Sequence, residues 1–131
     1  MPLPWSVDGP SAGFSSTGET WLPQPSWFRE VAAEAQDGVP GSTLELYREL
    51  LRLRAELDLG RGDLEWIDLQ SGVLAFRRGQ VGVISNLSTT DVGLPDDVDV
   101  LVYSDRLGEG DRPTKTVGPD CTVWFRLNDV G

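Results

Sequence analysis

The sequence predicts a mainly β protein, a small antiparallel sheet or sandwich preceded by one amphipathic helix and an irregular, aromatic-rich N-terminal segment. Three observations predict it. Residues 63–128 hold short runs rich in Val, Ile, Phe and Trp, separated by turn-forming residues. Residues 42–58 carry leucines at helical spacing. Residues 1–41 contain six of the nine prolines, which excludes long helices and central strands there.

The N-terminal segment is too aromatic for a solvated linker. Its first 28 residues contain five aromatic side chains, namely Trp5, Phe14, Trp21, Trp27 and Phe28. A segment that is irregular and aromatic-rich usually packs against a larger surface. Within it, Trp27–Gln36 is ambiguous, because its alanines and apolar spacing favour a helix while the prolines at either side limit that helix to a marginal length.

Helix signals are clearest over residues 42–58. Ser42 and Glu45 form the S-x-x-E pattern of a capping box immediately before the periodic run. Gly60 follows the run and predicts its end. The apolar stripe comprises Leu46, Leu50, Leu53 and Leu57, widened by Tyr47 and Leu51. These positions predict an amphipathic helix that docks by one face.

Five strands are expected after the helix. They cover residues 64–68, 73–77, 81–87, 98–103 and 122–127, with a loop over 108–113. Residues 74–77 and 81–84 should form a hairpin across Arg78-Gly79-Gln80. Alternation in the last strand places Val123, Phe125 and Leu127 on one face and Thr122, Trp124 and Arg126 on the other. We expect Trp66 and Trp124 to lie in the core.

Charge and composition exclude several classes of function. Eleven basic and 21 acidic residues give a formal net charge of −10, which argues against nucleic acid or an anionic membrane as partner. The absence of histidine and the single Cys121 exclude histidine-based catalysis, a zinc site and an internal disulfide. No phosphate-binding glycine motif occurs, so no cofactor is expected. Without a signal peptide or an apolar span, a cytoplasmic location is expected.

Carboxylates are the remaining candidates for catalysis. Asp8, Glu19, Glu65 and Asp68 are conceivable members of a glycosidase-type pair, but their spacing does not specify one. We interpret most acidic residues as solvated surface. Residues 96–99 lack the ligand alternation and glycine of a calcium loop, so we interpret them as a charged turn, and no metal site is expected.

Exposed tryptophans suggest a second interpretation. Sugar rings stack on exposed aromatic side chains, and in this interpretation Trp5, Trp21 and Trp27 together form a carbohydrate platform. Prolines and glycines surround each of these residues, which favours loops that fix the segment against another domain. The sequon beginning at Asn86 has no expected role without a secretory signal.

The order of the motifs resembles a known family. The elements are PLPW at 2–5, SAGFS at 11–15, WLPQP at 21–25, VAAEAQ at 31–36 and STLELYRELLRLRAE at 42–56. Together they are similar to consecutive elements of α-glucosidases and oligo-1,6-glucosidases of glycoside hydrolase family thirteen, the α-amylase family. VLAFRRG at 73–79, followed by a strand ending in residues 86–88, resembles the C-terminal domain of that family.

This resemblance implies an architecture. In the family, a (β/α)₈ barrel carries the active site and a small antiparallel β-domain follows it. Residues 1–61 would then correspond to the end of the barrel, with an irregular loop over 1–41 and the last helix over 42–58. Residues 62–131 would be the C-terminal β-domain. The resemblance also favours coil over helix for Trp27–Gln36.

The departures from the family concern catalysis. The family's trio of an aspartate nucleophile, a glutamate acid/base and a supporting aspartate has no matching position here, and its sugar-binding histidines are missing. Only Trp5 and Asp8 correspond to the rim of the active site, and Trp21 and Trp27 are candidates for contact with sugar or a partner. We therefore expect a structural fragment of an α-glucosidase-like hydrolase, inactive alone, whose partner is a catalytic barrel or an oligosaccharide. A stand-alone carbohydrate- or partner-binding module is the alternative.

Overall fold

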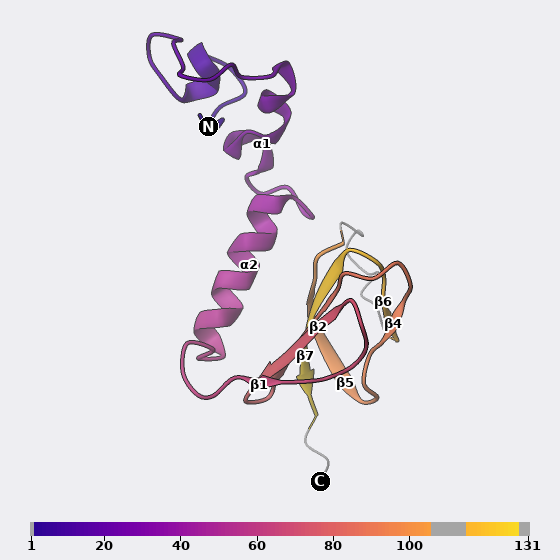
Figure 1. Cartoon of the computed structure of the whole chain (residues 1–131). Helices are drawn as coiled ribbons and strands as arrows, with labels where there is room; N and C mark the ends of the chain where they lie inside the picture. The colour runs from indigo at the N-terminus through magenta and orange to yellow at the C-terminus, as the bar shows by residue number, and fades with distance from the viewer. Residues whose placement is uncertain (1, 106–114, 129–131) are drawn as a thin grey trace. The chain divides into compact units, whose positions relative to one another are not determined.

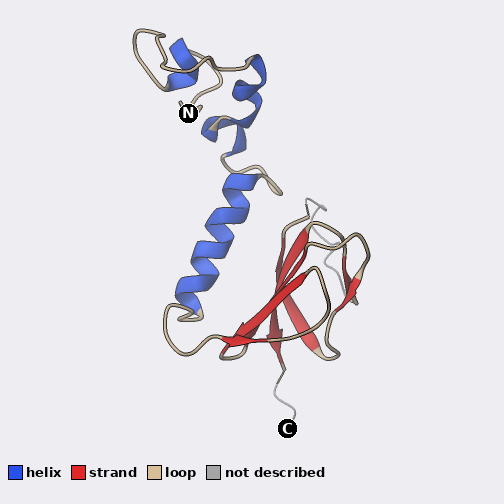
Figure 2. Ribbon diagram, viewed as in Figure 1, coloured by secondary structure: helices blue, strands red, loops and turns tan. Residues whose placement is uncertain are grey.

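A computed structural model describes residues 2–105 and 115–128, and it confirms a mainly β chain (Figures 1 and 2). Its helical elements are η1 (Pro10–Gly13), η2 (Ser26–Val31), α1 (Ala33–Gln36) and α2 (Thr43–Glu56). Its strands are β1 (Glu65–Trp66), β2 (Val73–Arg78), β3 (Val81–Asn86), β4 (Val92–Gly93), β5 (Val98–Tyr103), β6 (Thr116–Val117) and β7 (Cys121–Leu127).

The chain divides into two compact units, Met1–Arg48 and Glu49–Gly131. We call these unit 1 and unit 2. Helix α2 begins in unit 1 and ends in unit 2, whereas the division expected from the sequence fell at residues 61 and 62.

The expected coil over Trp27–Gln36 is wrong. This stretch forms the 3₁₀ helix η2 and the single α-helical turn α1. The first amide groups of α1 are satisfied by the N-terminal strand-like segment, because Ala33 N donates to Pro4 O at 3.2 Å and Glu34 N donates to Trp5 O at 3.0 Å. Ala32, between the two helices, is fully buried. A helix this short therefore depends on tertiary hydrogen bonds at its N-terminus rather than on propensity alone.

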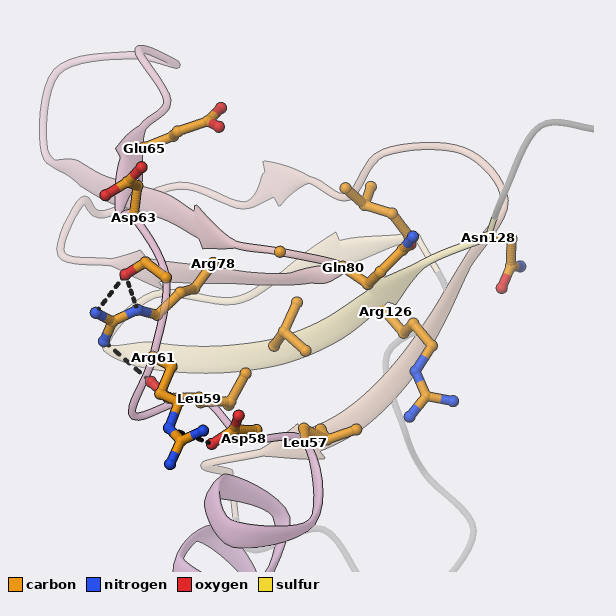
Figure 3. Close-up of a pocket in the computed structure, with 14 residues that line it drawn as sticks. Leu57, Asp58, Leu59, Arg61, Asp63, Glu65, Arg78, Gln80, Arg126 and Asn128 are labelled. Carbon is orange, nitrogen blue, oxygen red and sulfur yellow. Dashed lines mark hydrogen bonds and ion pairs between the residues drawn. The ribbon is translucent and has the colours of Figure 1, made fainter.

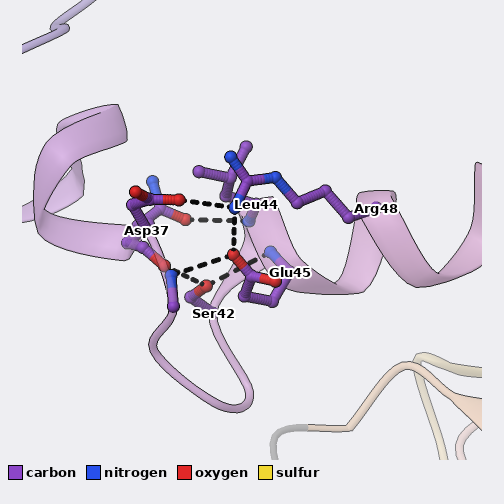
Figure 4. A network of polar contacts seen from close by, with 7 residues as sticks. Asp37, Ser42, Leu44, Glu45 and Arg48 are labelled. Atoms are coloured by element: carbon purple, nitrogen blue, oxygen red, sulfur yellow. Dashed lines mark hydrogen bonds and ion pairs between the residues drawn. The ribbon is translucent and has the colours of Figure 1, made fainter.

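Helix α2 begins in a network that joins it to the end of α1 (Figure 4). Ser42 Oγ accepts a hydrogen bond from Glu45 N at 3.3 Å, so half of the expected capping box is present. The other half is replaced, because Glu45 Oε1 accepts from Gly38 N at 3.0 Å. Arg48 bridges Asp37 and Glu45 at 2.5 and 2.6 Å, and the hydrogen bond to Asp37 is the largest cause of a raised Arg48 pKa.

The C-terminus of α2 differs from expectation. Asp58 rather than Gly60 adopts the left-handed conformation that ends the helix, with a φ of 48°. Asp58 N donates to Ala55 O at 3.2 Å and Leu59 N donates to Arg54 O at 3.0 Å, which is the pair of bonds in a Schellman motif. A residue with a Cβ is strained at this position, and a negative side chain there opposes the helix dipole.

Replacing Asp58 by Gly should therefore stabilise the protein. We expect Asp58→Gly to raise the free energy of unfolding by about 1 kcal/mol, because glycine adopts a positive φ without the Cβ penalty. Urea denaturation of the full chain measures it. Asp68→Gly is the matched control, since Asp68 is exposed and is not among the residues with positive φ. An unchanged or lowered stability of Asp58→Gly would contradict this account of the helix end.

The strands form two antiparallel sheets. The larger has the order β1-β2-β3-β7-β5, and β4 pairs with β6 in the smaller. The expected hairpin is confirmed, with Arg78 paired to Val81 across a turn in which Gly79 has a φ of 58°. Strands β4 and β6, which are two residues each, were not predicted from the sequence. The loop expected over 108–113 lies outside the described residues.

One face of the large sheet carries the closed core. Its buried members are Ala75, Ile84, Val92, Val117, Val123 and Phe125. The predicted alternation in β7 is confirmed, because Val123 and Phe125 are buried on this face. Phe125 pairs with Gly82 of β3, and a Cβ on that glycine would lie 2.2 Å from the Phe125 ring. Only glycine leaves room for the far end of the Phe125 ring beside the neighbouring strand.

Asn86 is a fully buried polar residue at the edge of this core. Its Nδ2 donates to Thr90 O at 2.8 Å and to Val117 O at 2.9 Å, while its Oδ1 accepts from Ser88 N at 3.0 Å and from the Ser88 hydroxyl at 2.7 Å. Every polar atom of the side chain is therefore paired, as burial requires. The buried amide therefore has a structural role, joining β3 to the segments that carry Thr90 and Val117.

The other face of the large sheet carries a row of apolar residues flanked by polar ones, among them Arg78, Ser85, Thr122 and Arg126. The strand registers align one residue from each of five strands in a cross-strand row, which we call the apolar row: Trp66, Phe76, Val83, Trp124 and Val102. Trp66 is 67% exposed and Trp124 is half-buried, so the expectation that both lie in the core is wrong. They lie on the face opposite the closed core, since both are in register with Val83 and not with Ile84.

Candidate functional site

The segment that carries Trp5 and Asp8 is held by its backbone. Trp5 N and Ser6 N both donate to Ala12 O, at 2.8 and 3.1 Å. The guanidinium of Arg29 donates to Val7 O at 2.6 Å and to Gly9 O at 3.1 Å. These bonds fix the path of the chain and leave the side chains of Trp5 and Asp8 exposed to solvent.

The other two predicted contact residues are also exposed. Trp21 is 96% exposed, and Trp27 is 53% exposed with its ring edge-on to Phe28 at 4.8 Å between centroids. Among the described residues, the ring contacts are those of Trp27 with Phe28 and of Trp66 with Phe76. The structure therefore presents the three N-terminal tryptophans to solvent without stacking them on one another.

A pocket of unit 2, about 760 Å³, lies where the segment after α2 passes the β2–β3 turn and the end of β7 (Figure 3). The residues labelled in the figure are Leu57, Asp58, Leu59, Arg61, Asp63, Glu65, Arg78, Gln80, Arg126 and Asn128. Arg78 makes three hydrogen bonds at this pocket. Its guanidinium donates to Leu59 O at 2.9 Å and twice to Gly62 O, at 2.8 and 3.2 Å. It ties the 57–63 segment to the hairpin.

Two acidic groups of this pocket, Asp58 and Glu65, are paired with arginine side chains. Glu65 Oε2 accepts from Arg77 Nε at 2.7 Å, and Asp58 lies 3.9 Å from the Arg61 guanidinium. The conceivable acids Asp8, Glu19, Glu65 and Asp68 are all exposed, whereas a glycosidase acid is held in a buried setting. Within residues 2–105 and 115–128, no cluster of three potential metal ligands occurs.

Tyr103 and Cys121 form a further polar contact inside unit 2. Burial raises the pKa of Tyr103, a hydrogen bond with Cys121 raises it further, and the Gly118 amide opposes both by donating to the phenolic oxygen at 3.4 Å. Both side chains also pack against the closed core. Their arrangement joins the β6–β7 turn to β5 and is structural.

Arg78 is the residue that sequence reasoning missed. It was interpreted only as part of a turn, yet the alternation of β2 places it on the same face as Phe76, where a cation needs partners. Helix-end carbonyls lack partners within the helix, and the carbonyls just beyond α2 provide these acceptors.

Removing this guanidinium should loosen the connection between α2 and the sheet. We expect Arg78→Gln to lower the free energy of unfolding by about 1–3 kcal/mol, because the half-buried Leu59 and the exposed Gly62 carbonyls lose three hydrogen bonds from a charged donor. Arg126→Gln in the same pocket is the matched control and should change it by less than about 0.5 kcal/mol. Thermal unfolding followed by circular dichroism compares the two. Equal effects would show that Arg78 has no special structural role.

The known proteins that this chain matches include α-glucosidases and a trehalose-6-phosphate hydrolase of known structure. No protein-family model matches the chain. It is 28% identical over 130 residues to a salivary α-glucosidase of Anopheles gambiae, covering 95% of this chain and 22% of the relative. It is 30% identical over 98 residues to the salivary α-glucosidase of Aedes aegypti, covering 71% of this chain and 17% of the relative. Trehalose-6-phosphate hydrolase of Bacillus licheniformis superposes with a TM-score of 0.74 at 29% identity.

The chain resembles the C-terminal part of an α-glucosidase of glycoside hydrolase family thirteen. This confirms the resemblance drawn from the order of the motifs. The superposition covers 98% of this chain and 25% of the Bacillus licheniformis hydrolase. The chain thus spans about a fifth of the two mosquito α-glucosidases. Among the residues of this chain that the structure describes, no helix has the length and apolarity to cross a bilayer.

Proposed function

We propose that this chain is a non-catalytic structural part of an α-glucosidase-like protein, whose β unit stabilises a catalytic barrel. The parent reaction would be retaining hydrolysis of α-glucosidic bonds. Its partner would be the catalytic barrel. The net charge of −10 argues against nucleic acid or an anionic membrane as a partner. Its location would be the cytoplasm, in keeping with one free cysteine.

One observation carries the proposal. Among the described residues of unit 1, four apolar side chains are buried, namely Pro2, Ala12, Phe28 and Ala32. Nine large hydrophobic side chains of the same unit are exposed, namely Leu3, Trp5, Phe14, Trp21, Leu22, Trp27, Val31, Val39 and Tyr47. A monomeric protein rarely leaves so much apolar surface in water, so this excess indicates a surface built to pack on a larger body.

The length of the matched hydrolase also supports a catalytic barrel as the partner. The matched solved structure has about four times the length of this chain, since the superposition covers 25% of it. Trp5 and Asp8 would then lie at the rim of the active site, and Trp21 and Trp27 would contact the barrel. Interfaces within one polypeptide commonly stabilise both sides, because neither side buries enough apolar surface alone.

A fusion tests this proposal. The matched quarter of the Bacillus licheniformis hydrolase is replaced by residues 1–131, and the same hydrolase truncated before that quarter is the control. We expect the fusion to raise the soluble yield several-fold over the truncated protein, because the apolar surfaces of both parts are covered. It should also unfold in one cooperative transition. Equal insolubility, or independent unfolding of the two parts, would contradict the proposal.

Carbohydrate binding is the second candidate, favoured by Trp21, which is 96% exposed. A sugar ring stacked on this indole would quench its fluorescence. For the structural role we expect no change when the maltose series is titrated into the full chain at millimolar concentration. Quenching that disappears in Trp21→Ala and persists in Trp66→Ala would favour the binding module, because Trp66 lies on the sheet.

A further inference from the structure

We propose that Asp8 is a site of spontaneous covalent modification, at which the main chain rearranges from an aspartyl to an isoaspartyl linkage. The sequence contains two Asp-Gly pairs, at residues 8–9 and 37–38. In such a pair the glycine has no Cβ to keep its amide nitrogen away from the aspartate Cγ, so the two atoms can react. The structure leaves these groups free at residues 8–9 and holds them at residues 37–38. The reaction is intrinsic to the chain and independent of the proposed function.

The rearrangement needs water and no other reactant. The Gly9 nitrogen attacks the Asp8 Cγ, a bond from nitrogen to Cγ closes a succinimide ring, and the carboxyl oxygen leaves as water. A water molecule then opens the ring. Attack at Cγ restores the aspartyl linkage, whereas attack at the main-chain carbonyl carbon breaks the original peptide bond and frees the α-carboxylate. The isoaspartyl chain therefore runs through Cβ and has the same mass as the original chain.

The reacting groups of Asp8 and Gly9 are free. Both residues are exposed, and neither the Asp8 carboxylate nor the Gly9 amide makes a hydrogen bond with any residue that the structure describes. Gly9 has a φ of 93°, and a Cβ placed on it would meet only the Ser6 hydroxyl, at 3.8 Å. No neighbouring group therefore has to move before the Gly9 nitrogen approaches the Asp8 Cγ.

The Ser6 hydroxyl assists the attack. It donates a hydrogen bond to Asp8 O, the carbonyl oxygen of the peptide whose nitrogen is the nucleophile. A peptide nitrogen attacks after it gives up its proton, and the negative charge is then shared with this oxygen. A hydrogen-bond donor at the oxygen stabilises that charge. Ser6 is held in place, because its own amide donates to Ala12 O at 3.1 Å.

The second Asp-Gly pair has both reacting groups engaged (Figure 4). Asp37 Oδ1 accepts from the Arg48 guanidinium at 2.5 Å, and the Gly38 amide donates to Glu45 Oε1 at 3.0 Å. The same Glu45 oxygen accepts from Arg48 at 2.6 Å, so the two contacts belong to one network. The Asp37 carboxylate and the Gly38 nitrogen must each leave a partner before they meet, which slows the reaction at this pair.

Rearrangement at Asp8 changes the main chain between two fixed points. The Arg29 guanidinium donates to Val7 O at 2.6 Å and to Gly9 O at 3.1 Å, on either side of Asp8. An isoaspartyl residue inserts one more carbon into the backbone between these carbonyls. The fork of a guanidinium is rigid, so it does not follow both acceptors as they separate. Modification at Asp8 therefore releases the segment that Arg29 holds.

Trypsin separates the two pairs for measurement, because it cuts after Arg29 and Arg48. Asp8 is the only aspartate of peptide 1–29, Asp37 is the only aspartate of peptide 30–48, and neither peptide contains asparagine. The isolated full chain is incubated in mildly acidic buffer at physiological temperature and then digested. An L-isoaspartate methyltransferase transfers a labelled methyl group from S-adenosylmethionine to the rearranged carboxylate, so the label on each peptide counts the isoaspartate at one site.

We expect the label to accumulate several-fold faster in peptide 1–29 than in peptide 30–48. In urea the two rates should become similar, because neither pair then keeps its native contacts. Ser6→Ala should slow the reaction in peptide 1–29 alone, and Arg48→Gln, the matched variant, should speed it in peptide 30–48 alone. Asp8→Glu should remove the label from peptide 1–29, since glutamate does not close a succinimide ring.

Equal rates in the folded chain, or a faster rate at Asp37, would overturn the inference. A difference that persists unchanged in urea would also overturn it, because the local sequence would then be its cause. An unaltered rate at Asp8 in Ser6→Ala would overturn the role of the Ser6 hydroxyl. All of these readouts use the isolated chain, so a failure of the hydrolase fusion overturns the proposed function and leaves this inference standing.

Discussion

The contact between the Phe125 ring and Gly82 sets the geometry of the large sheet. These two residues are paired across β3 and β7, and the ring occupies the space where any side chain at position 82 would stand. The Phe125 ring can therefore approach the backbone of β3 closely. It belongs to the closed core together with Ile84 and Val123. The small sheet, through Val92 and Val117, covers that core, and Asn86 ties β3 to it by donating to Val117 O. The core of unit 2 thus closes within the described residues.

The register that closes one face of the large sheet also decides which residues stand on the other face. Because side chains alternate across a strand, the register that places Phe125 and Ile84 in the core also places Trp124 and Val83 on the opposite face. That face has no second sheet of its own in the described chain, and its aromatic side chains remain half-exposed or exposed. Unit 1 has a similar character, since its helices are held by backbone hydrogen bonds and by Arg29 while its tryptophans face solvent. An α-glucosidase-like protein with a larger catalytic part would supply the missing surface for both.

Local patterns predicted the parts that depend on local chemistry. Ser42, the leucine stripe and the Gly79 turn predicted α2 and the β2–β3 hairpin, because caps and turns are encoded by neighbouring residues. Trp66 and Trp124 were assigned to the wrong face, since an apolar residue in a strand does not say which face is covered by the same chain. At α1 the alanines favoured a helix and the resemblance favoured coil, and the turn forms because its first amides donate to Pro4 and Trp5, about 30 residues earlier. The role of Arg78 depends in the same way on carbonyls at Leu59 and Gly62. The candidate rim residues Trp5 and Asp8 remain predictions from resemblance.

Native-state hydrogen exchange on the isolated full chain, under conditions where sedimentation shows a monomer, tests the central claim most directly. The claim is that unit 2 closes its own core while unit 1 depends on a surface beyond this chain. Exchange rates report the free energy of local opening, residue by residue. The account predicts that amides of β3 and β7 exchange slowest and that amides of residues 5–37 exchange far faster. Protection of residues 5–37 equal to that of β3 in the monomer would contradict the account, because unit 1 would then be stable without a partner.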